Sequence, residues 1–435
     1  MCVLRETSRE DGVLGTGILS MEMEQEKGKE SFHIAMPAQA EAILEALNHR
    51  GFEAYIVGGC VRDSLLGRVP GDWDITTSAL PGQVKSVFRR TVDTGIAHGT
   101  VTVLKGREAY EVTTYRIDGE YEDNRHPKNV VFTSNLAEDL KRRDFTINAM
   151  AYSPGTGLMD LFDGAGDLKR GLIRCVGDPT ERFTEDALRM LRAIRFRAQL
   201  GFDIEEATRQ ALRNLAPSLV HVSKERIQTE LTKLLLSDHP DYIREVFDDS
   251  MAPYVCAGFC RIRPENISID GRVPPVRHLR WAALLRHLTE EEAGKILKEL
   301  KLDNDTILRV RSLTRWWRIP VGPDEISVRK VMSQMPRRQF DDLMLFKRFS
   351  SERPETDEEL SRIQELTDRI RERGDCVSLK TLALTGRDLI ELGMEPGPAL
   401  GEALESLLGI VLEHPEKNQK EALVQELKKD HKKST

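Results

Sequence analysis

The stretch YIVGGCVRDSLLGRVPGDWDITT, residues 55–77, joins a short apolar run to a glycine pair and then to two aspartates on either side of a tryptophan. The apolar run before Gly58 is typical of a buried strand, and the segment after Gly59 predicts a short helix. Asp72 and Asp74 are two residues apart in a second predicted strand, so both would point to the same face. The stretch therefore predicts a strand, a turn and a helix beside a pair of carboxylates.

Two converging carboxylates can hold divalent cations, and Mg²⁺ prefers oxygen ligands that water and substrate phosphates complete. We therefore expect Asp72 and Asp74 to bind Mg²⁺. Two such ions, about 4 Å apart, can activate an attacking hydroxyl and stabilise a leaving pyrophosphate. Glu111, in the predicted strand AYEVTTYRI, has the chemistry of a third carboxylate. A solvated turn is the alternative interpretation of an Asp-x-Asp pair taken alone.

The glycine pair predicts a place where a phosphate can approach the backbone. Gly58 and Gly59 allow close contact with a ligand, and the helix that begins there offers free N–H groups. Arg62, one turn into that helix, adds a charged donor. A purely structural turn is the alternative, but it explains neither the arginine nor the nearby acid pair. The spacing also differs from a P-loop, because the GxxxxGK[ST] pattern is absent.

Composition is that of a globular chain with several domains. At 435 residues the chain predicts about three units of roughly 150 residues each. Hydrophobic residues make up 40% and charged residues 31%, and no apolar run approaches the roughly 20 residues of a membrane helix. The N-terminal MCVLRETSREDGVLG carries charges where a secretory signal would be apolar, so we expect a cytoplasmic protein. The six cysteines lack zinc-site spacing, which favours buried free thiols.

The net charge of −7 hides a basic segment. Residues 261–350 contain 19 Lys and Arg against 12 Asp and Glu, together with Trp281, Trp316 and Trp317. Basic residues beside aromatic ones suit contacts with RNA phosphates and bases. The alternative is a solvated helical face whose tryptophans lie in the core.

The order of predicted elements divides the chain. A helix at 36–52 is followed by predicted strands, among them 53–59, 99–106 and 109–117, which form an α/β head. From about residue 175 helical periods dominate to the C-terminus. The predicted regions are a disordered leader at 1–30, an α/β head at 31–174, and helical regions at 175–240, 241–350 and 351–435.

Three motifs then carry a family resemblance. In chain order they are GGCVRDSLLGRVPGDWDI (58–75), EDLKRRDFTINAMAY (138–152) and RFTEDALRMLRAIRFRAQLGF (182–202). They resemble the successive motifs of bacterial class II tRNA nucleotidyltransferases, the CCA-adding enzymes, which are relatives of bacterial poly(A) polymerase. The resemblance covers about residues 35–235, and the helical remainder is similar to the family's body and tail in length and composition.

The resemblance implies a fold and an activity. The fold is a nucleotidyltransferase head like that of DNA polymerase β, followed by an all-α region of neck, body and tail. The activity is addition of CCA to the 3′ end of tRNA from CTP and ATP, without a nucleic-acid template and with release of pyrophosphate. The tRNA would be contacted at its 3′ end and at its acceptor and T arms.

The resemblance also implies roles for residues of the first two motifs. Gly59 and Arg62 would hold the triphosphate, and Glu111 would assist deprotonation of the attacking tRNA hydroxyl. In RRDFTINAM, Arg143 would contact the nucleotide phosphates, while Asp144 and Asn148 would bind the ribose. The alternative for this stretch is a structural junction between strand and helix.

The third motif predicts a helix that is capped near Thr184 and ends before Gly201. Asp186 and Arg189 would be neighbours on the face opposite its apolar stripe. Cytosine and adenine both present an amine donor beside a ring-nitrogen acceptor, so this pair could select them and reject uracil and guanine. Arg192 and Arg195 would continue the basic side toward phosphate or base. The alternative is a surface ion pair. The apolar stripe would comprise Ala187, Leu188, Leu191, Ile194 and Ala198.

Several functions remain open at this point. A poly(A) polymerase would share the head motifs, but residues 79–106 lack the Gly-Arg-Arg-Phe and His-Val patterns of that branch. Enzymes that add only CC or only A form a second alternative. The polar segment 119–129 predicts a mobile loop. In the class that the chain resembles, enzymes that add only CC have a shortened loop here, so the resemblance implies complete CCA addition, with an A-only enzyme as the alternative that would also keep the loop. A non-catalytic RNA-binding scaffold is a third alternative, which the joint presence of all these polar residues disfavours.

Overall fold

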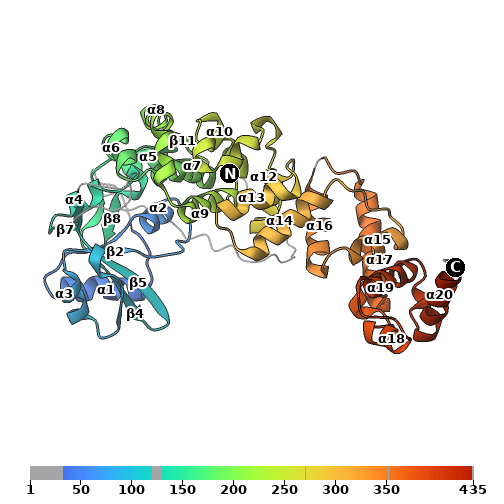
Figure 1. Ribbon diagram of the computed structural model, residues 1–435. Helices are drawn as coiled ribbons and strands as arrows, with labels where there is room; N and C mark the ends of the chain where they lie inside the picture. The colour runs from blue at the N-terminus through green and yellow to red at the C-terminus, as the bar shows by residue number, and fades with distance from the viewer. Residues whose placement is uncertain (1–32, 120–129, 270, 351, 434–435) are drawn as a thin grey trace, which may run out of the picture. The chain divides into compact units, whose positions relative to one another are not determined.

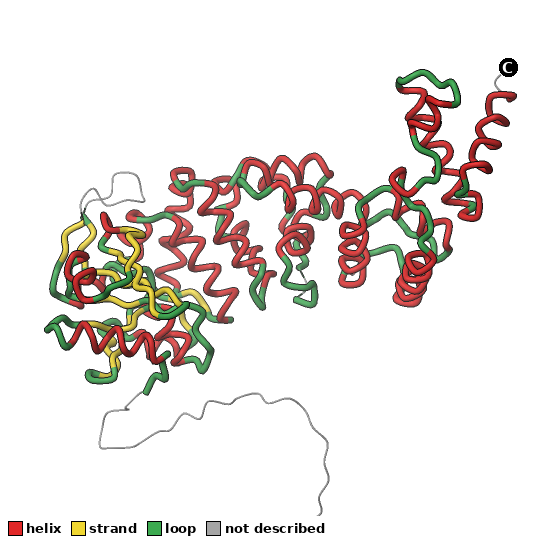
Figure 2. The backbone as a smooth tube through the Cα atoms, turned by 90° about the horizontal axis from the view of Figure 1, so that it is seen from below, coloured by secondary structure: helices red, strands yellow, loops and turns green. Residues whose placement is uncertain are grey.

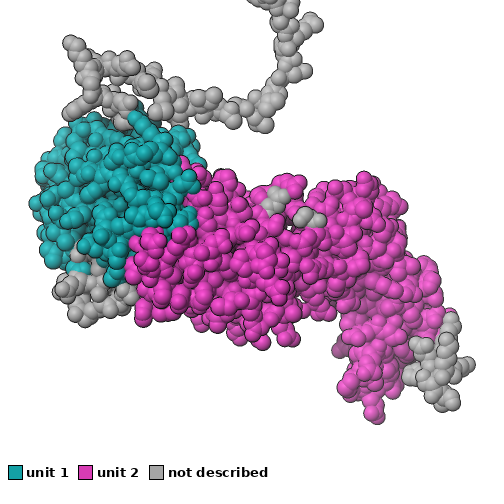
Figure 3. All heavy atoms as spheres, turned by 90° about the horizontal axis from the view of Figure 1, so that it is seen from above, with its two compact units in different colours: residues 1–186, 203–209 teal, residues 187–202, 210–435 magenta. Residues whose placement is uncertain are grey.

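The computed structural model describes residues 33–119, 130–269, 271–350 and 352–433 (Figure 1). The leader expected at 1–30 and nearly all of the loop expected at 119–129 lie outside the described residues. The chain divides into two compact units, residues 1–186 with 203–209 and residues 187–202 with 210–435 (Figure 3). The further division of the helical region at residues 240 and 350 stays a prediction.

The first unit is built on a mixed seven-stranded sheet with the strand order β3-β4-β5-β2-β1-β8-β9. Strand β2 runs parallel to β5, whereas the other neighbouring strands pair antiparallel. The strands are β1 (Ala54–Val57), β2 (Ile75–Thr77), β3 (Thr91–Gly95), β4 (Thr100–Lys105), β5 (Glu108–Thr114), β8 (Met150–Ser153) and β9 (Gly157–Asp160). The smaller pairs are β6 (Arg116–Asp118) with β7 (Val130–Phe132), and β10 (Leu172–Ile173) with β11 (Asp203–Ile204).

Helices pack against this sheet through apolar residues at helical spacing. In α1 (Ala38–Asn48) the buried positions are Ala40, Ile43, Leu44 and Leu47, which share one face. Helix α1 packs on β1 and β2, and α3 packs on β4 and β5. The other helices of this unit are α2 (Gly59–Leu65), α3 (Pro81–Val87), α4 (Leu136–Lys141), α5 (Gly164–Arg170) and α6 (Pro179–Glu185).

The register of β2 positions the candidate site. Ile75 is opposite Ile56 of β1 and beside Val112 of β5. The end of β1, the residues just before β2 and Glu111 of β5 therefore meet at one edge of the sheet. The start of β8 joins them, because the Gly58 N–H donates to the Met150 carbonyl at 3.1 Å.

The α/β head and the helical remainder are confirmed, but the predicted strand at the acid pair is wrong at its start. Strand β2 begins at Ile75, so Asp72 and Asp74 precede it. The reason lies in the partner strand, because β1 leaves the sheet at Gly58. The last backbone bond of this ladder joins the Val57 N–H to the Asp74 carbonyl at 3.0 Å.

The second unit is helical (Figure 2). Helix α7 packs on α9, α14 packs on α12, α13 and α16, and α15 packs on α17 and α19. The first helices are α7 (Leu188–Leu200), α8 (Glu206–Leu215), whose first residues belong to the first unit, α9 (Lys224–Leu235), α10 (Glu245–Asp248), α11 (Ala252–Val255), α12 (Arg277–Leu285), α13 (Glu290–Glu299) and α14 (Asn304–Trp316). The remaining helices are α15 (Glu325–Ser333), α16 (Arg337–Phe349), α17 (Asp357–Arg373), α18 (Gly386–Glu391), α19 (Pro398–Glu413) and α20 (Lys420–Lys433).

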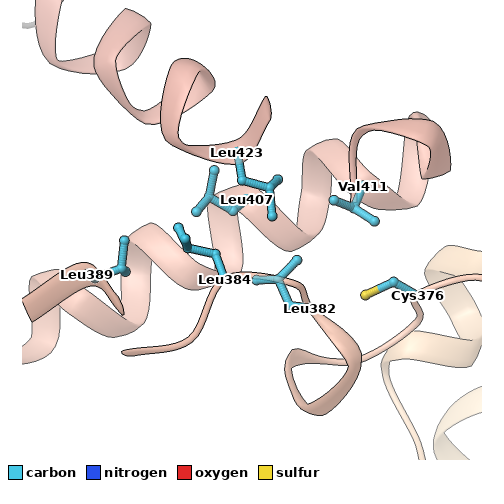
Figure 4. Close-up of a cluster of buried hydrophobic side chains, with 7 residues drawn as sticks. All are labelled: Cys376, Leu382, Leu384, Leu389, Leu407, Val411 and Leu423. Carbon is cyan, nitrogen blue, oxygen red and sulfur yellow. The ribbon is translucent and has the colours of Figure 1, made fainter. Parts of the chain in front are cut away.

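Large side chains fill the interior of this unit. Trp281 and Trp317 are at most 1% exposed, so these two tryptophans are core residues, as the alternative interpretation of the basic segment predicted. Near the C-terminus a separate cluster joins α18, α19 and α20 through Leu389, Leu407 and Leu423, and Leu407 lies beside Leu423 (Figure 4). Among the described residues no helix is both long and apolar enough to cross a membrane.

Candidate active site

The turn after β1 requires a glycine at its first position. Gly58 has φ +80° and ψ −125°, a backbone conformation that residues with a Cβ rarely adopt. A Cβ on Gly58 would lie 3.0 Å from Nη1 of Arg143. Gly59 differs, because a Cβ there would meet only Nη2 of Arg62 at 3.8 Å, an ordinary contact distance. The sequence therefore needs Gly58 both for the turn and for the approach of Arg143.

The acid pair lies next to this turn. Asp72, Asp74 and Glu111 are all exposed side chains. Although Asp74 is open to solvent on one side, desolvation by the surrounding protein raises the pKa of its carboxyl; Arg143 opposes this shift, and the charges of Glu111 and Asp72 add to it. The structure thus brings together the three carboxylates that the sequence singled out. Negative charges gathered around one desolvated carboxylate attract a cation.

Arg143 faces this acid pair with most of its donors unused. Its one hydrogen-bond partner among the described residues is Asp139, whose Oδ2 accepts from Nη2 at 3.4 Å. The Nε of Arg143 is buried without a partner within the described structure, although the side chain is 19% exposed. A guanidinium has five N–H donors, and buried donors are normally paired. Arg143 is therefore arranged to receive an anion.

A chain of hydrogen bonds links the other head residues that the sequence analysis predicted to bind the nucleotide. Arg62 donates from Nη1 to Oδ1 of Asn148 at 2.6 Å and from Nε to Asp63 at 2.8 Å. The amide of Asn148 donates to Asp144 at 3.1 Å. Asp144 and Asn148 are 8% and 6% exposed. These residues lie together and fix one another's orientation.

The predicted end of the third motif's helix before Gly201 is confirmed, because α7 ends at Leu200, but its predicted start near Thr184 is wrong. Pro179 at the first turn and the Asp178 cap start α6 early, and Thr184 lies inside it with its hydroxyl donating to the Thr180 carbonyl at 2.7 Å. Asp186 follows α6 in an extended conformation, with φ −144° and ψ 101°. It therefore does not share a helical face with Arg189, which lies in α7.

Helix α7 presents a different surface from the one predicted. Its apolar stripe is buried as expected, but Arg189 is only 9% exposed and so is not a surface side chain. The Nε of Arg195 lies 2.7 Å from Oε2 of Glu230, and Nη1 of Arg192 lies 3.7 Å from its Oε1. Glu230 therefore matches part of the basic charge on this helix. The three arginines belong to the second unit, whereas Asp186 belongs to the first.

The sequence analysis missed two acids that bind arginines of the candidate site. Asp139 binds Arg142 and Arg143, and Glu230 binds Arg195. Asp139 lies three and four residues before Arg142 and Arg143, a spacing that places it on the same helical face. That spacing was a usable signal. Glu230 lies in α9, far from its partners in the chain, and no local pattern marks it.

The head carboxylates fit a divalent cation that a substrate helps to hold. Among the described residues no three acidic, histidine or cysteine side chains are placed to bind a metal by themselves. Asp72 and Asp74 therefore offer an incomplete shell of hard oxygen ligands, the kind that phosphate oxygens complete around Mg²⁺. The nearby Cys60 is no nucleophile, because burial and the charge of Asp74 raise its pKa to about 12.

Comparison with family models covers the first two sequence motifs and most of the helical region. A poly(A) polymerase head domain matches residues 54–174. A probable RNA- and SrmB-binding site of polymerase A matches residues 201–255, and a putative second domain of tRNA nucleotidyltransferases matches residues 276–427.

Whole-chain relatives decide between the family's branches. A CCA-adding enzyme of Leuconostoc mesenteroides is 38% identical over 373 residues, which cover 85% of this chain and 90% of the relative. The CCA-adding enzyme of Levilactobacillus brevis is 38% identical over 426 residues, which cover 92% and 99%. This chain belongs to the CCA-adding enzymes.

Solved structures agree with this membership. The CCA-adding enzyme of Bacillus stearothermophilus in complex with CTP matches with a TM-score of 0.77 and 31% identity over 92% of this chain and 100% of that one. A Thermotoga maritima CCA-adding enzyme complexed with tRNA is 24% identical with a TM-score of 0.58 over 89% and 94% of the two chains, a likeness that shows the fold. Nucleotidyltransferases of this family use divalent metal ions.

The contrast between the two glycines generates a prediction. Gly58→Ala should destabilise this CCA-adding enzyme by about 1–3 kcal/mol, because the backbone is strained and Arg143 must move. Gly59→Ala should change stability by less than about 1 kcal/mol, since φ is ordinary and alanine favours a helix. Urea unfolding of the full chain measures both. Equal losses in the two variants would show that the turn tolerates a side chain.

Proposed function

We propose that this chain adds CCA to the 3′ end of tRNA, with CTP and ATP as substrates and pyrophosphate as the released product. The observation that carries the proposal is the pairing of an acid cluster with an unsatisfied guanidinium. Asp72, Asp74 and Glu111 converge at one edge of the sheet, and Arg143 lies beside them with a buried Nε that has no partner among the described residues. The carboxylates can bind a metal ion, and the guanidinium can bind a phosphate.

In this proposal Asp72 and Asp74 hold Mg²⁺ together with the nucleotide phosphates. Hard oxygen ligands and an incomplete protein shell are what Mg²⁺ accepts in phosphoryl-transfer sites. When bound, the metal would activate the attacking hydroxyl and stabilise the charge on the leaving pyrophosphate. Ionised Asp74 would then gain a cation, which would offset the desolvation and the neighbouring negative charges that raise its pKa.

The phosphates would be bound by the turn and two arginines. Gly58 and Gly59 have no side chains that would keep a phosphate from the backbone of the turn. Arg143 would donate from its N–H groups that have no partner within the described structure, and Arg62 would add a second guanidinium. Bidentate contacts of this kind are typical of arginine with phosphate. Asp144 and Asn148, which are already fixed by mutual hydrogen bonds, would bind the ribose.

The chemical step joins the tRNA to the α-phosphate. The 3′-hydroxyl oxygen of the tRNA forms a bond to the α-phosphorus, the bond to the bridging oxygen breaks, and pyrophosphate leaves. Glu111 accepts the proton of the hydroxyl, directly or through water, as a general base. The protein forms no covalent intermediate in this scheme.

The base would be selected by Asp186 and Arg189. The carboxylate of Asp186 can accept from the exocyclic amine of cytosine or adenine, and Arg189 can donate to the neighbouring ring nitrogen. Arg192 and Arg195 would support the base or its phosphates from the same helix. Their contacts with Glu230 reduce the net charge there, which suits recognition of a neutral base better than attraction of any phosphate.

The helical regions would recognise the base and bind the tRNA. We assign base recognition to 175–240, tRNA binding to 241–350 and a tail to 351–435. Arg261, Arg263 and Arg318 line one cavity of about 460 Å³ in the second unit, which could admit a backbone phosphate. A cytoplasmic location follows from the proposed substrate, since tRNA is processed where it is made and used.

A primer-extension experiment tests the function. Given tRNA that ends at its discriminator base, with CTP and ATP, the product should grow by three nucleotides. Asp74→Ala should abolish growth while tRNA binding by filter retention persists, because the carboxylate serves chemistry more than docking.

Other products would identify other enzymes. Growth that stops at two nucleotides would identify a CC-adding enzyme, and growth only on tRNA that already ends in CC would identify an A-adding one. A long tail from ATP alone would identify a poly(A) polymerase. No growth with any substrate would leave an RNA-binding scaffold.

Nucleotide choice should depend on the base-selecting pair. Asp186→Ala and Arg189→Ala should both slow addition of CTP and ATP and raise the relative use of UTP and GTP, because each removes one partner that rejects the wrong base. Single-nucleotide incorporation with each NTP measures this. Arg197→Ala is the matched control on the same helix, since Arg197 binds Glu245 at 2.6 Å. If the control changes nucleotide choice equally, the effect comes from loss of structure in α7.

Affinity for tRNA should depend on exposed arginines of the basic segment. Arg315 and Arg318 have side chains that are 59% and 58% exposed. Reversing both to glutamate should weaken tRNA binding roughly tenfold or more and reduce its salt dependence, since fewer counterions are released. Lys85→Glu in the head, with a 42% exposed side chain, is the control. An effect no larger than that of the control would make Arg315 and Arg318 ordinary surface residues.

A further inference from the structure

Asp139 is a fully buried carboxylate in α4 that no motif assignment uses. It is 0% exposed, and its partners come from a strand, a helix end and a neighbouring strand. Oδ1 accepts from Nε and Nη2 of Arg142 at 3.0 and 2.8 Å. It also accepts from the backbone N–H of Arg116 at 3.4 Å. One buried charge therefore joins α4 to β6.

The second oxygen connects the two halves of the candidate site. Oδ2 accepts from the hydroxyl of Thr76 at 3.1 Å and from Nη2 of Arg143 at 3.4 Å. Thr76 belongs to β2, two residues after Asp74. The same oxygen thus contacts the strand that follows the acid pair and the guanidinium that faces it.

Arg143 depends on this contact for its direction. Its Nη1 lies 3.0 Å from the place where a Cβ of Gly58 would be, and Asp139 accepts its one hydrogen bond within the described structure. Its charge opposes the rise in the pKa of Asp74 that desolvation causes, yet the two side chains form no ion pair among the described residues. Arg143 and Thr76, which is two residues after Asp74, share Oδ2 of Asp139, so the guanidinium is held near Asp74 without pairing with it.

We propose that Asp139 is a positioning residue that holds Arg143 against the Gly58 turn and away from Asp74, so that the guanidinium meets the nucleotide phosphates and Asp74 stays available to metal. The inference rests on the proposed function. Arg142 takes the stronger bonds of the carboxylate, which leaves Arg143 held by one long bond with its other donors open. Thr76 ties this arrangement to β2.

A purely structural role is the competing explanation. Buried carboxylates that bind arginines stabilise folds without touching chemistry, and removing one partner is costly wherever it occurs. Asp249 offers a matched control, because it is also 0% exposed and binds Arg213 at 2.7 Å in the second unit. A structural role predicts that Asp139→Asn and Asp249→Asn behave alike.

The experiment compares the variants Asp139→Asn, Thr76→Val and Asp249→Asn with the unsubstituted protein. Steady-state extension at saturating tRNA gives KM and kcat for CTP and ATP, and titration with MgCl₂ gives the concentration for half-maximal rate. Calorimetry gives the Kd for CTP in EDTA, where only protein groups hold the phosphates. Urea unfolding shows which variants are folded at the assay temperature.

Asp139→Asn should raise KM for both nucleotides and the metal-free Kd for CTP by roughly tenfold to a hundredfold, the range expected for loss of a charged hydrogen bond. It should also raise the MgCl₂ requirement, because Arg143 then competes for Asp74. Thr76→Val keeps the charge and should show the same changes at smaller size. Asp249→Asn should change stability alone.

Three outcomes would overturn the inference. Unchanged KM and Kd in Asp139→Asn, within about twofold, would show that Arg143 needs no positioning. Equal kinetic losses in Asp249→Asn would show a general loss of structure. If Asp139→Asn does not fold, Thr76→Val decides alone, and an unchanged Kd there overturns the proposal. Failure of the original chain to extend tRNA would instead refute the proposed function.

Discussion

The pairing of β2 with a neighbour on each side is the constraint on which the site depends. Antiparallel pairing with β1 sets Asp74 beside the Gly58 turn, and parallel pairing with β5 sets it beside Glu111. Because side chains alternate along a strand, a slip of one residue would turn the acids to the other face. The buried contact of Thr76 with Asp139 resists such a slip. The register thus decides whether the carboxylates meet at all.

The two acids beside β2 make opposite contributions to stability. Desolvation and like charges raise the pKa of Asp74, so its contribution to stability is present below the ordinary aspartate pKa and is lost as pH rises through the raised value. Asp139 is desolvated too, but Arg142 and Arg143 outweigh this and lower its pKa, so its contribution is present above the ordinary pKa and is lost on acidification. The protein therefore disfavours the ionised form of Asp74, which a bound cation would stabilise. It favours the ionised form of Asp139, which its arginine partners already stabilise.

The sequence was sufficient for local features and insufficient for contacts between distant segments. The glycine turn, the acid pair and the buried stripe of α7 could be predicted because turn chemistry and periodicity are local. The break at Asp186 could not, since a helix capped by Asp178 and begun by Pro179 competes for the same residues. The partnership of Glu230 with Arg195 joins two helices that only tertiary packing brings together. Trp317 was ambiguous because a tryptophan beside arginines suits either a core or an RNA surface.

The arginines near the site differ more in how closely each guanidinium is paired with a carboxylate than in their exposed fractions. Arg142 and Arg195 each have a carboxylate oxygen within 2.8 Å, so their charge is largely compensated by the fold. Arg143 is about as exposed as Arg142, with side chains 19% and 18% exposed, yet it shares the same carboxylate at 3.4 Å and keeps a buried Nε without a partner within the described structure. A buried donor left unpaired costs stability that folding alone does not return. In the proposed function, a nucleotide phosphate bound with its metal beside the two aspartates would supply the acceptor for this donor and so offset the cost.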